Sequence, residues 1–418
     1  MAFGTAWKRL SPRQLNFAIQ AFSLIAIFFE GYDQGVMGGV NASPRYVQEV
    51  AIGTPAGVVT NDVKQGGIVS IYYLGAIVGC FVGGWAADRI GRINGLFYAA
   101  FFALIGGALQ AATQSADFIL IARVVTGLGT GVLTGITPVM ISEVSSATHR
   151  GGYLGYVFIA DYLGISIAYW LSFGLAFVDN GYSDVRWNFF WAFNFVLLRQ
   201  AGYSALKQNG LAGGLNAIGI VGTIISAQIV DKLGRRPCLM GGAGGLAVVN
   251  LIAASLYEAA RHNRSISTQV APAAVTMLFL FNLVYAATWG TVAFLVPTEI
   301  FPSDLRAQGN GFGITGWAIG VGWAVLVNPI MFGHLENRTY FLFAGLNLLW
   351  IPIVYLLYPE TKDRSLESID AMFSSSSPFF NQMERSYELN KDVVALAGGE
   401  RAKSVASVEK GHEPGTYK

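Results

Sequence analysis

The amino-acid sequence predicts an all-α polytopic membrane protein. Hydrophobic residues make up 53% of its 418 residues and charged residues only 12%, whereas about a quarter of the residues in a soluble protein are charged. A single soluble core could not bury that much apolar side chain. Apolar runs of about 20 residues, the length that crosses a bilayer as a helix, also recur along the chain.

Ten segments qualify as membrane-spanning helices, because each is long enough to cross about 30 Å of hydrocarbon. They lie at residues 15–40, 66–87, 94–113, 117–142, 152–178, 211–230, 237–257, 271–297, 308–333 and 340–358. A further apolar stretch at 188–198 is too short to cross alone and leads into the polar residues 199–210. We predict that it forms a broken or re-entrant segment on the outer side, which leaves about ten full spans.

The distribution of basic residues predicts which ends of the spans face the cytoplasm. With a cytoplasmic N-terminus and no crossing at 188–210, the loops that carry Arg and Lys all fall on the inner side, as the positive-inside rule requires. These loops are residues 88–93, 143–151, 231–237, 298–307 and 359–364. The sequons at Asn263 and Asn337 then fall outside, where both are candidate glycosylation sites. Both termini are predicted to be cytoplasmic.

A charged motif recurs in the two halves of the chain. Asp88–Arg92 and Asp231–Arg235 both read Asp, basic residue, any residue, Gly, Arg, and each half has a Glu followed seven residues later by Arg. This repeat indicates that the two halves share one plan. Carboxylates that face guanidinium groups can also form charge-assisted networks. We predict an inner gate, with solvated basic loops as the alternative. Its residues are Asp88, Arg89, Arg92, Glu143, Arg150, Asp231, Arg235, Arg236, Glu299 and Arg306.

Two ionisable residues lie inside predicted spans. Asp33 falls in the first and Arg123 in the fourth, and a charge at such depth is costly enough to indicate a function. Their depths are compatible with pairing. A static structural ion pair is the alternative to a functional one.

The rest of the composition excludes several functions. A formal net charge of +2 provides no large basic surface for nucleic acid. Cys80 and Cys238 lie in or beside apolar segments without metal-binding spacing, so we predict inert packing residues. We recognise no nucleophile and base arrangement and no metal-ligand cluster. The sequence therefore predicts no enzyme, no metal and no cofactor.

Six motifs follow one another along the membrane portion. They are Gly31–Gly39, Gly83–Arg92, Arg123–Gly131 running on to Glu143 and Arg150-Gly151, Asp231–Arg236, Pro297–Pro302, and Pro359–Glu367. This ordered set resembles the sugar porter family of the major facilitator superfamily, and most of all its fungal monosaccharide transporters. The resemblance implies two six-helix bundles in the plasma membrane that expose a central hexose or pentose site to each side in turn. It assigns the charged loops to the inner gate, with lipid and a small sugar as partners.

The resemblance also implies roles for buried residues. In proton-coupled members an acid and an arginine at the matching positions form a switchable pair, so Asp33 would bind the proton and Arg123 would tune it. Trp289, Phe294 and Trp317 fall in the tenth and eleventh helices of the family, where aromatic rings would contact the sugar. Phe294 stands where the family usually has Trp.

The sequence departs from the family between its two halves. A long cytoplasmic loop and a seventh helix with Gln-Gln-x-Ser-Gly-x-Asn are expected there, and both are absent after Leu198. We divide the chain accordingly into a cytoplasmic N-terminus (1–14), an N-terminal bundle with a truncated last helix (15–198), an outer junction (199–210), a C-terminal bundle without its first helix (211–364) and a disordered cytoplasmic tail (365–418).

The missing segment predicts a functional loss. Its glutamines and asparagine supply much of the sugar's hydrogen bonding in the family, so we expect proton-coupled sugar transport that is impaired in this chain. Two alternatives remain open. The chain could be a non-transporting sugar sensor or regulatory protein, or the non-functional product of a skipped exon or a faulty gene model.

Overall fold

The computed structural model describes most of the chain. The described residues are 11–41, 44–54, 59–145, 150–175, 205–262, 267–301, 305–362 and 379–388, together with 364, 369, 372 and 373. Within these ranges the structure is almost wholly helical, and its single β-bridge joins Gly53 to Val59. The all-α class predicted from composition is confirmed. The path predicted for 188–198 and for the junction up to residue 204 lies outside the described residues.

The described residues of the N-terminal half form five long helices and one short one. They are α1 (Pro12–Asn41), α2 (Pro44–Glu49), α3 (Asp62–Ile90), α4 (Arg92–Ala111), α5 (Ala116–Val144) and α6 (Arg150–Leu175). Side-chain caps fix two of the starts: Asn61 accepts a hydrogen bond from the backbone N–H of Lys64, and Ser115 accepts one from Phe118. These caps satisfy N–H groups that have no partner within their own helices.

The described part of the C-terminal half begins at residue 205 and forms mostly long helices. They are α9 (Ala205–Leu233), α10 (Arg235–His262), α11 (Ser267–Ala287), α12 (Trp289–Ile300), α13 (Arg306–Leu335) and α14 (Arg338–Leu357). The span expected at 271–297 is divided between α11 and α12, because Thr288 leaves the helical conformation with φ −128° and ψ −81°. Its hydroxyl donates to the carbonyl of Val284 at 2.7 Å, a local bond that competes with regular helix.

The glycine of the repeated motif has a structural role. Gly91 separates α3 from α4 with φ +87°, and Gly234 separates α9 from α10 with φ +98°. Glycine adopts this half of backbone space far more readily than other residues. The same turn is thus built once in each half.

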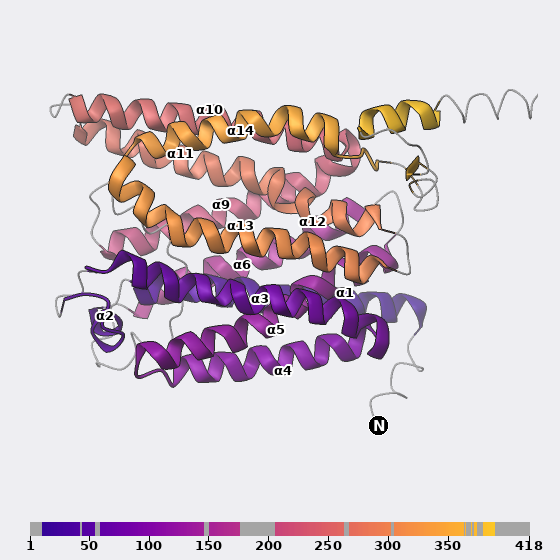
Figure 1. Ribbon diagram of the computed structural model, residues 1–418, viewed down its shortest axis with the longest axis horizontal. Helices are drawn as coiled ribbons and strands as arrows, with labels where there is room; N and C mark the ends of the chain where they lie inside the picture. The colour runs from indigo at the N-terminus through magenta and orange to yellow at the C-terminus, as the bar shows by residue number, and fades with distance from the viewer. Residues whose placement is uncertain are drawn as a thin grey trace, which may run out of the picture.

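Helices pack closely at the centre of the molecule. Helix α3 packs on α5 and on α13, α1 packs on α6, and α6 packs on α9, so α3–α13 and α6–α9 join the two halves (Figure 1). A methyl group on Gly31 of α1 would lie 2.1 Å from the carbonyl oxygen of Asp161, and one on Gly164 of α6 would lie 2.2 Å from that of Phe28. Glycine at both positions lets α1 and α6 touch along their backbones.

The helices have the dimensions and surface of a membrane protein. Nine helical segments of the described residues are long and apolar enough to cross a bilayer, and α1, which carries Glu30 and Asp33, is not among the nine. Large apolar side chains lie on the outside, such as Leu104 and Phe97 of α4, which are 73% and 63% exposed. Such a surface suits lipid rather than water. The chain is an integral membrane protein.

Part of the C-terminal tail packs against the helices. Residues 380–388 form a helix, whose Glu384 pairs with Arg236 at 2.8 Å and whose Glu388 pairs with Arg364 at 2.9 Å. Over these residues the structure differs from the predicted disordered tail, because the ion pairs hold the segment against the end of α14 and the start of α10.

Candidate functional site

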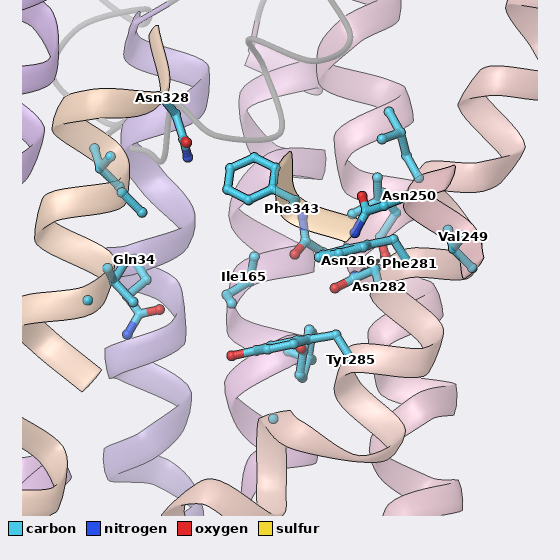
Figure 2. Close-up of a pocket in the computed structure, with 18 of the residues that line it drawn as sticks. Gln34, Ile165, Asn216, Val249, Asn250, Phe281, Asn282, Tyr285, Asn328 and Phe343 are labelled. Carbon is cyan, nitrogen blue, oxygen red and sulfur yellow. Dashed lines mark hydrogen bonds between the residues drawn. The ribbon is translucent and has the colours of Figure 1, made fainter. Parts of the chain in front are cut away.

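A cavity of about 400 Å³ lies between the two halves, within the size range of small-molecule sites. Helices α1 and α6 line it from the N-terminal half, and α9, α10, α11, α12, α13 and α14 from the C-terminal half. Figure 2 shows Gln34 and Asn328 on one side of the cavity and Asn216, Asn250 and Asn282 on the other. The wall combines apolar and aromatic surface with a few polar groups, as in sites for polar organic molecules.

The amide side chains of the wall are fixed by the backbone. The Nδ2 atoms of Asn216, Asn282 and Asn347 donate to the carbonyl oxygens of Ala212, Leu215 and Phe343 at 2.8, 2.6 and 2.8 Å. Since a carbonyl oxygen only accepts, the NH₂ group must face it in each case. Each asparagine keeps its Oδ1 atom as an acceptor and a second N–H as a donor.

Two carboxyl groups line the cavity as well. Glu30 of α1 is only 4% exposed and accepts a hydrogen bond from Nε2 of Gln34 at 3.1 Å. Asp161 of α6 lies against the backbone of Gly31, and its Oδ1 atom is buried without a hydrogen-bond partner among the described residues. The contact between α1 and α6 thus brings two acids to one wall.

The three predicted aromatic contacts separate into two groups. Phe294 and Trp317 line the cavity, with ring centroids 5.7 Å apart, and Phe158 packs on Phe294 at 4.7 Å. Phe158 belongs to the N-terminal half and Phe294 to the C-terminal half, so this ring contact bridges them. Trp289 is not among the lining residues, because its Nε1 atom donates to the carbonyl of Leu239 and its ring packs on Trp350.

Asp33 and Arg123 lie on neighbouring helices but are not paired. Oδ1 of Asp33 accepts from Nε2 of Gln110 at 3.2 Å. Arg123 is 1% exposed, donates to the carbonyl of Val69 and lies over the ring of Tyr72 at 4.7 Å. Within the described residues, Oδ2 of Asp33 and two guanidinium nitrogens of Arg123 have no hydrogen-bond partner. Both groups are thus incompletely satisfied in this conformation.

The charged loops meet at one end of the bundle, the end at which α12 and α14 stop (Figure 1). In the N-terminal half, Arg92 pairs with Asp88 at 2.8 Å and with Glu143 at 3.0 Å. These pairs tie together the ends of α3 and α5 and the start of α4. Arg89 instead lies over the ring of Trp85 at 4.7 Å.

The C-terminal half forms a more deeply buried network. Arg235 makes two hydrogen bonds to Glu299, at 2.8 and 3.1 Å, and both side chains are 2% exposed. Thr361 also donates to Glu299, and Glu360 accepts from the backbone N–H groups of Arg235 and Arg236. A carboxylate at the start of a helix satisfies free N–H groups and complements the helix dipole.

Two contacts join the halves at this end. Oδ2 of Asp231 accepts from the backbone N–H of Gly152 at 2.8 Å, and Oδ1 accepts from Gly151 at 3.2 Å. Asp231 also pairs with Arg235 at 3.2 Å. Gln308 of α13 donates to Asp88, which joins the halves on the other side. The loops predicted to form a gate thus include two cross-bundle contacts.

Other predicted positions have different surroundings. Arg306 is 4% exposed, and its Nε atom has no hydrogen-bond partner among the described residues. The side chain of Arg150 and all of Asn263 lie outside the described residues. Asn337 precedes α14, and its Nδ2 atom donates to Glu258 at 3.5 Å. Cys80 and Cys238 are buried free thiols.

Sequence reasoning missed the acids and amides of the cavity. Glu30 and Asp161 both lie within predicted spans, so the depth argument that identified Asp33 also applies to them. Asn216, Asn250 and Asn282 gave no such signal, because an asparagine in a span costs less and has no fixed spacing.

Comparison with known proteins places the chain among transporters. The profile of the family "Sugar (and other) transporter" matches residues 19–199 and 196–373. The sugar transporter STL1 of Saccharomyces cerevisiae is 25% identical over 485 residues, which cover 88% of this chain and 83% of the yeast protein. A probable quinate permease of Aspergillus fumigatus is 24% identical over 492 residues, covering 88% and 90%. The structure of the proton:xylose symporter XylE superimposes with a TM-score of 0.68 at 17% identity, covering 86% of this chain and 99% of XylE.

Proposed function

Because this chain belongs to the sugar porter family of the major facilitator superfamily, we propose that it carries a monosaccharide across the membrane by alternating access. The observation that carries the proposal is the central cavity between two bundles whose charged ends are joined by Asp231 and the N-terminus of α6. A carrier of this kind needs a site near mid-membrane and a contact between bundles that forms in one state and breaks in the other. No covalent step is involved.

The cavity supplies groups that suit a sugar. Phe294 and Trp317 offer ring faces for the C–H side of a pyranose, and the asparagine oxygens accept hydrogen bonds from its hydroxyls. The predicted contacts at Phe294 and Trp317 are part of this proposal. Trp289 does not contact the sugar in this proposal. Its indole N–H instead joins α12 to α10 behind the cavity wall.

We place the transporter in the plasma membrane with both termini in the cytoplasm. The end that contains Arg92, Arg235 and Arg236 is then the inner end, because basic residues stay on the cytoplasmic side. In this orientation the described conformation is closed inward by the contacts of Asp231 and Asp88. Glycosylation at Asn337 would fall on the outer face.

Proton coupling through Asp33 and Arg123 is the second element of the proposal. The two groups lie on adjacent helices without an ion pair between them among the described residues. This arrangement favours a pair that forms in only part of the cycle over a static one. Binding of a proton by Asp33 would then bias the equilibrium between the two conformations.

We expect a low rate of transport because the chain lacks a segment between its two halves. The two family matches meet at residues 196–199, the position at which the loop and the seventh helix are expected. We propose that transport is slow because the wall lacks that helix's hydrogen-bonding groups. The test measures uptake of labelled hexose by a transporter-null host that expresses this chain. It compares that uptake with uptake by the same host expressing the chain with the restored segment. Uptake as fast as that of the restored chain contradicts the impairment.

A further inference from the structure

We infer that Gln110 is a positioning residue for proton coupling, because its amide holds the carboxylate of Asp33 apart from the guanidinium of Arg123. The inference rests on the proposed coupling through Asp33 and Arg123 and adds a third residue to it. Gln110 lies one residue before the end of α4, and it is only 2% exposed. A buried amide is costly unless its polar atoms have partners, so the partners of Gln110 indicate its role.

The hydrogen bonds of Gln110 fix the orientation of its amide. Nε2 donates to Oδ1 of Asp33 at 3.2 Å and also to Oγ1 of Thr126. The hydroxyl of Thr126 donates to the carbonyl of Ala122 at 2.9 Å, so its oxygen accepts from Gln110. An ionised carboxylate likewise only accepts. Both N–H groups of the amide are therefore used, and Oε1 has no partner among the described residues.

The support for this amide lies on α5. A methyl group on Gly106, one turn before Gln110, would lie 2.3 Å from Oγ1 of Thr126, so α4 and α5 touch at this point. Thr126 is on the same helix as Arg123, three residues further along. Gln110 thus binds Asp33 of α1 while it is held against the helix that carries the arginine.

Asp33 and Arg123 each have buried groups that the other could satisfy. Oδ2 of Asp33 and the Nε and Nη1 atoms of Arg123 have no hydrogen-bond partner among the described residues. The guanidinium donates to the carbonyl of Val69 at a long 3.4 Å and lies over the ring of Tyr72. A charge-assisted pair is about twice as strong as a neutral hydrogen bond. The bond from Gln110 holds Asp33 against this attraction.

The position of Gln110 has a defined effect on proton binding. With the amide in place, the carboxylate is stabilised by a neutral donor, and it binds a proton more readily than it would beside a guanidinium. Without the amide, Asp33 can pair with Arg123, and the pair favours the ionised form. Gln110 therefore keeps Asp33 able to take up the coupled proton.

The test follows the protonation of Asp33 by infrared spectroscopy of the full purified chain in lipid nanodiscs. In each background, the carboxylic C=O band that is lost with Asp33→Asn belongs to Asp33, so its growth on acidification gives a titration midpoint without any transport. Other titratable groups face this region and stay unaltered within each difference. They are Glu30 on α1, Tyr46 on α2, Tyr72 and Tyr73 on α3, Arg123 on α5 and Asp161 on α6.

Gln110→Met should lower the midpoint by about one pH unit, which is about tenfold weaker proton binding. Methionine keeps the length of the side chain and removes both N–H groups. Thr113→Val is the matched control and should leave the midpoint unchanged, because Thr113 is buried just beyond the same helix end and its hydroxyl donates to the carbonyl of Leu109. In an Arg123→Gln background, Gln110→Met should not lower the midpoint, since the competing guanidinium is gone.

Thr126→Val is a second variant, for use if Gln110→Met does not fold. It removes the hydroxyl that supports the amide and should lower the midpoint by a smaller amount. An unchanged or raised midpoint in the variant that folds, or an equal fall in the Arg123→Gln background, would overturn the inference and leave coupling through Asp33 standing. If no band of Asp33 titrates in the unaltered chain, both the inference and the coupling through Asp33 are wrong.

Discussion

Asp231, close to the end of α9, accepts hydrogen bonds from the backbone N–H groups of Gly152 and Gly151 at the start of α6. The carboxylate therefore caps a helix of the opposite bundle while its other partner, Arg235, belongs to its own bundle. A group shared in this way can hold the inner end closed and let it open when the cap is lost. Four predictions follow from this and the neighbouring geometry.

Asp231→Asn should shift the conformational equilibrium toward the inward-open state. The amide keeps the volume but loses the charge that interacts with the positive start of α6 and with Arg235. Cys238, in the first turn of α10, is buried in the described state, so its alkylation in a Cys80→Ser background should speed up several-fold. Asp117→Asn, at the start of α5 on the other end, is the control. An unchanged alkylation rate for Asp231→Asn would remove Asp231 from the gate.

Glu299→Gln should destabilise the folded protein strongly. It removes the buried charged partner of Arg235 and leaves the less buried Asp231 beside the guanidinium, and breaking a buried pair costs about 3–5 kcal/mol. The exposed pair of Arg261 and Glu336, with side chains 51% and 56% exposed, provides the comparison, because Glu336→Gln should cost less than about 1 kcal/mol. Thermal unfolding in detergent measures both. Equal losses would show that burial does not matter at Glu299.

Gly91→Ala should destabilise the turn between α3 and α4 through the backbone alone. Gly91 has φ +87° and ψ +153°, and an added Cβ would meet no atom within 4 Å, so the cost of about 1–3 kcal/mol comes from conformation. Gly234→Ala should cost more, since its Cβ would also lie 2.6 Å from Oε2 of Glu360. Gly107→Ala, inside α4 with open space around it, should be neutral or stabilising. A loss at Gly107 as large as at Gly91 would contradict this.

Asp33→Asn should remove the pH dependence of transport if Asp33 carries the coupled proton. The substitution is best made in the chain with the restored central segment, in which rates are high enough to compare. Counterflow between equal pools of sugar, which needs no net proton movement, should continue, while uphill uptake driven by a pH gradient should be lost. Unchanged pH dependence would assign the proton to another group.

The sequence was sufficient for the helices but not for the cavity. Apolar length located most of the spans to within a few residues of the helices, and the motif repeat pointed to Gly91 and Gly234 as equivalent turns. The break at Thr288 could not be predicted, because α11 and α12 are equally apolar on both sides of it. The position of Trp289 behind the wall also depends on a contact with Leu239, fifty residues earlier, that no local pattern encodes.

The acids of the cavity also show that a local sequence pattern does not specify contacts between helices. Glu30 and Asp161 were visible as charges within spans, but their approach to one another depends on the close packing of α1 on α6 at Gly31 and Gly164. The pairing predicted for Asp33 and Arg123 rested on similar depth alone. Depth does not specify which face of a helix a side chain occupies, and here the two groups contact Gln110 and Tyr72 instead of each other.

The central claim is that a sugar crosses the membrane through the cavity between the two bundles. Uptake of labelled hexose by proteoliposomes tests it most directly, with this chain, the chain with the restored segment, and Ala324→Trp, which fills the cavity wall, made in both. We predict saturable uptake that is slower in this chain than in the restored one and that Ala324→Trp abolishes in both. Uptake by the restored chain no faster than by protein-free liposomes, or uptake unaffected by Ala324→Trp, would contradict the claim.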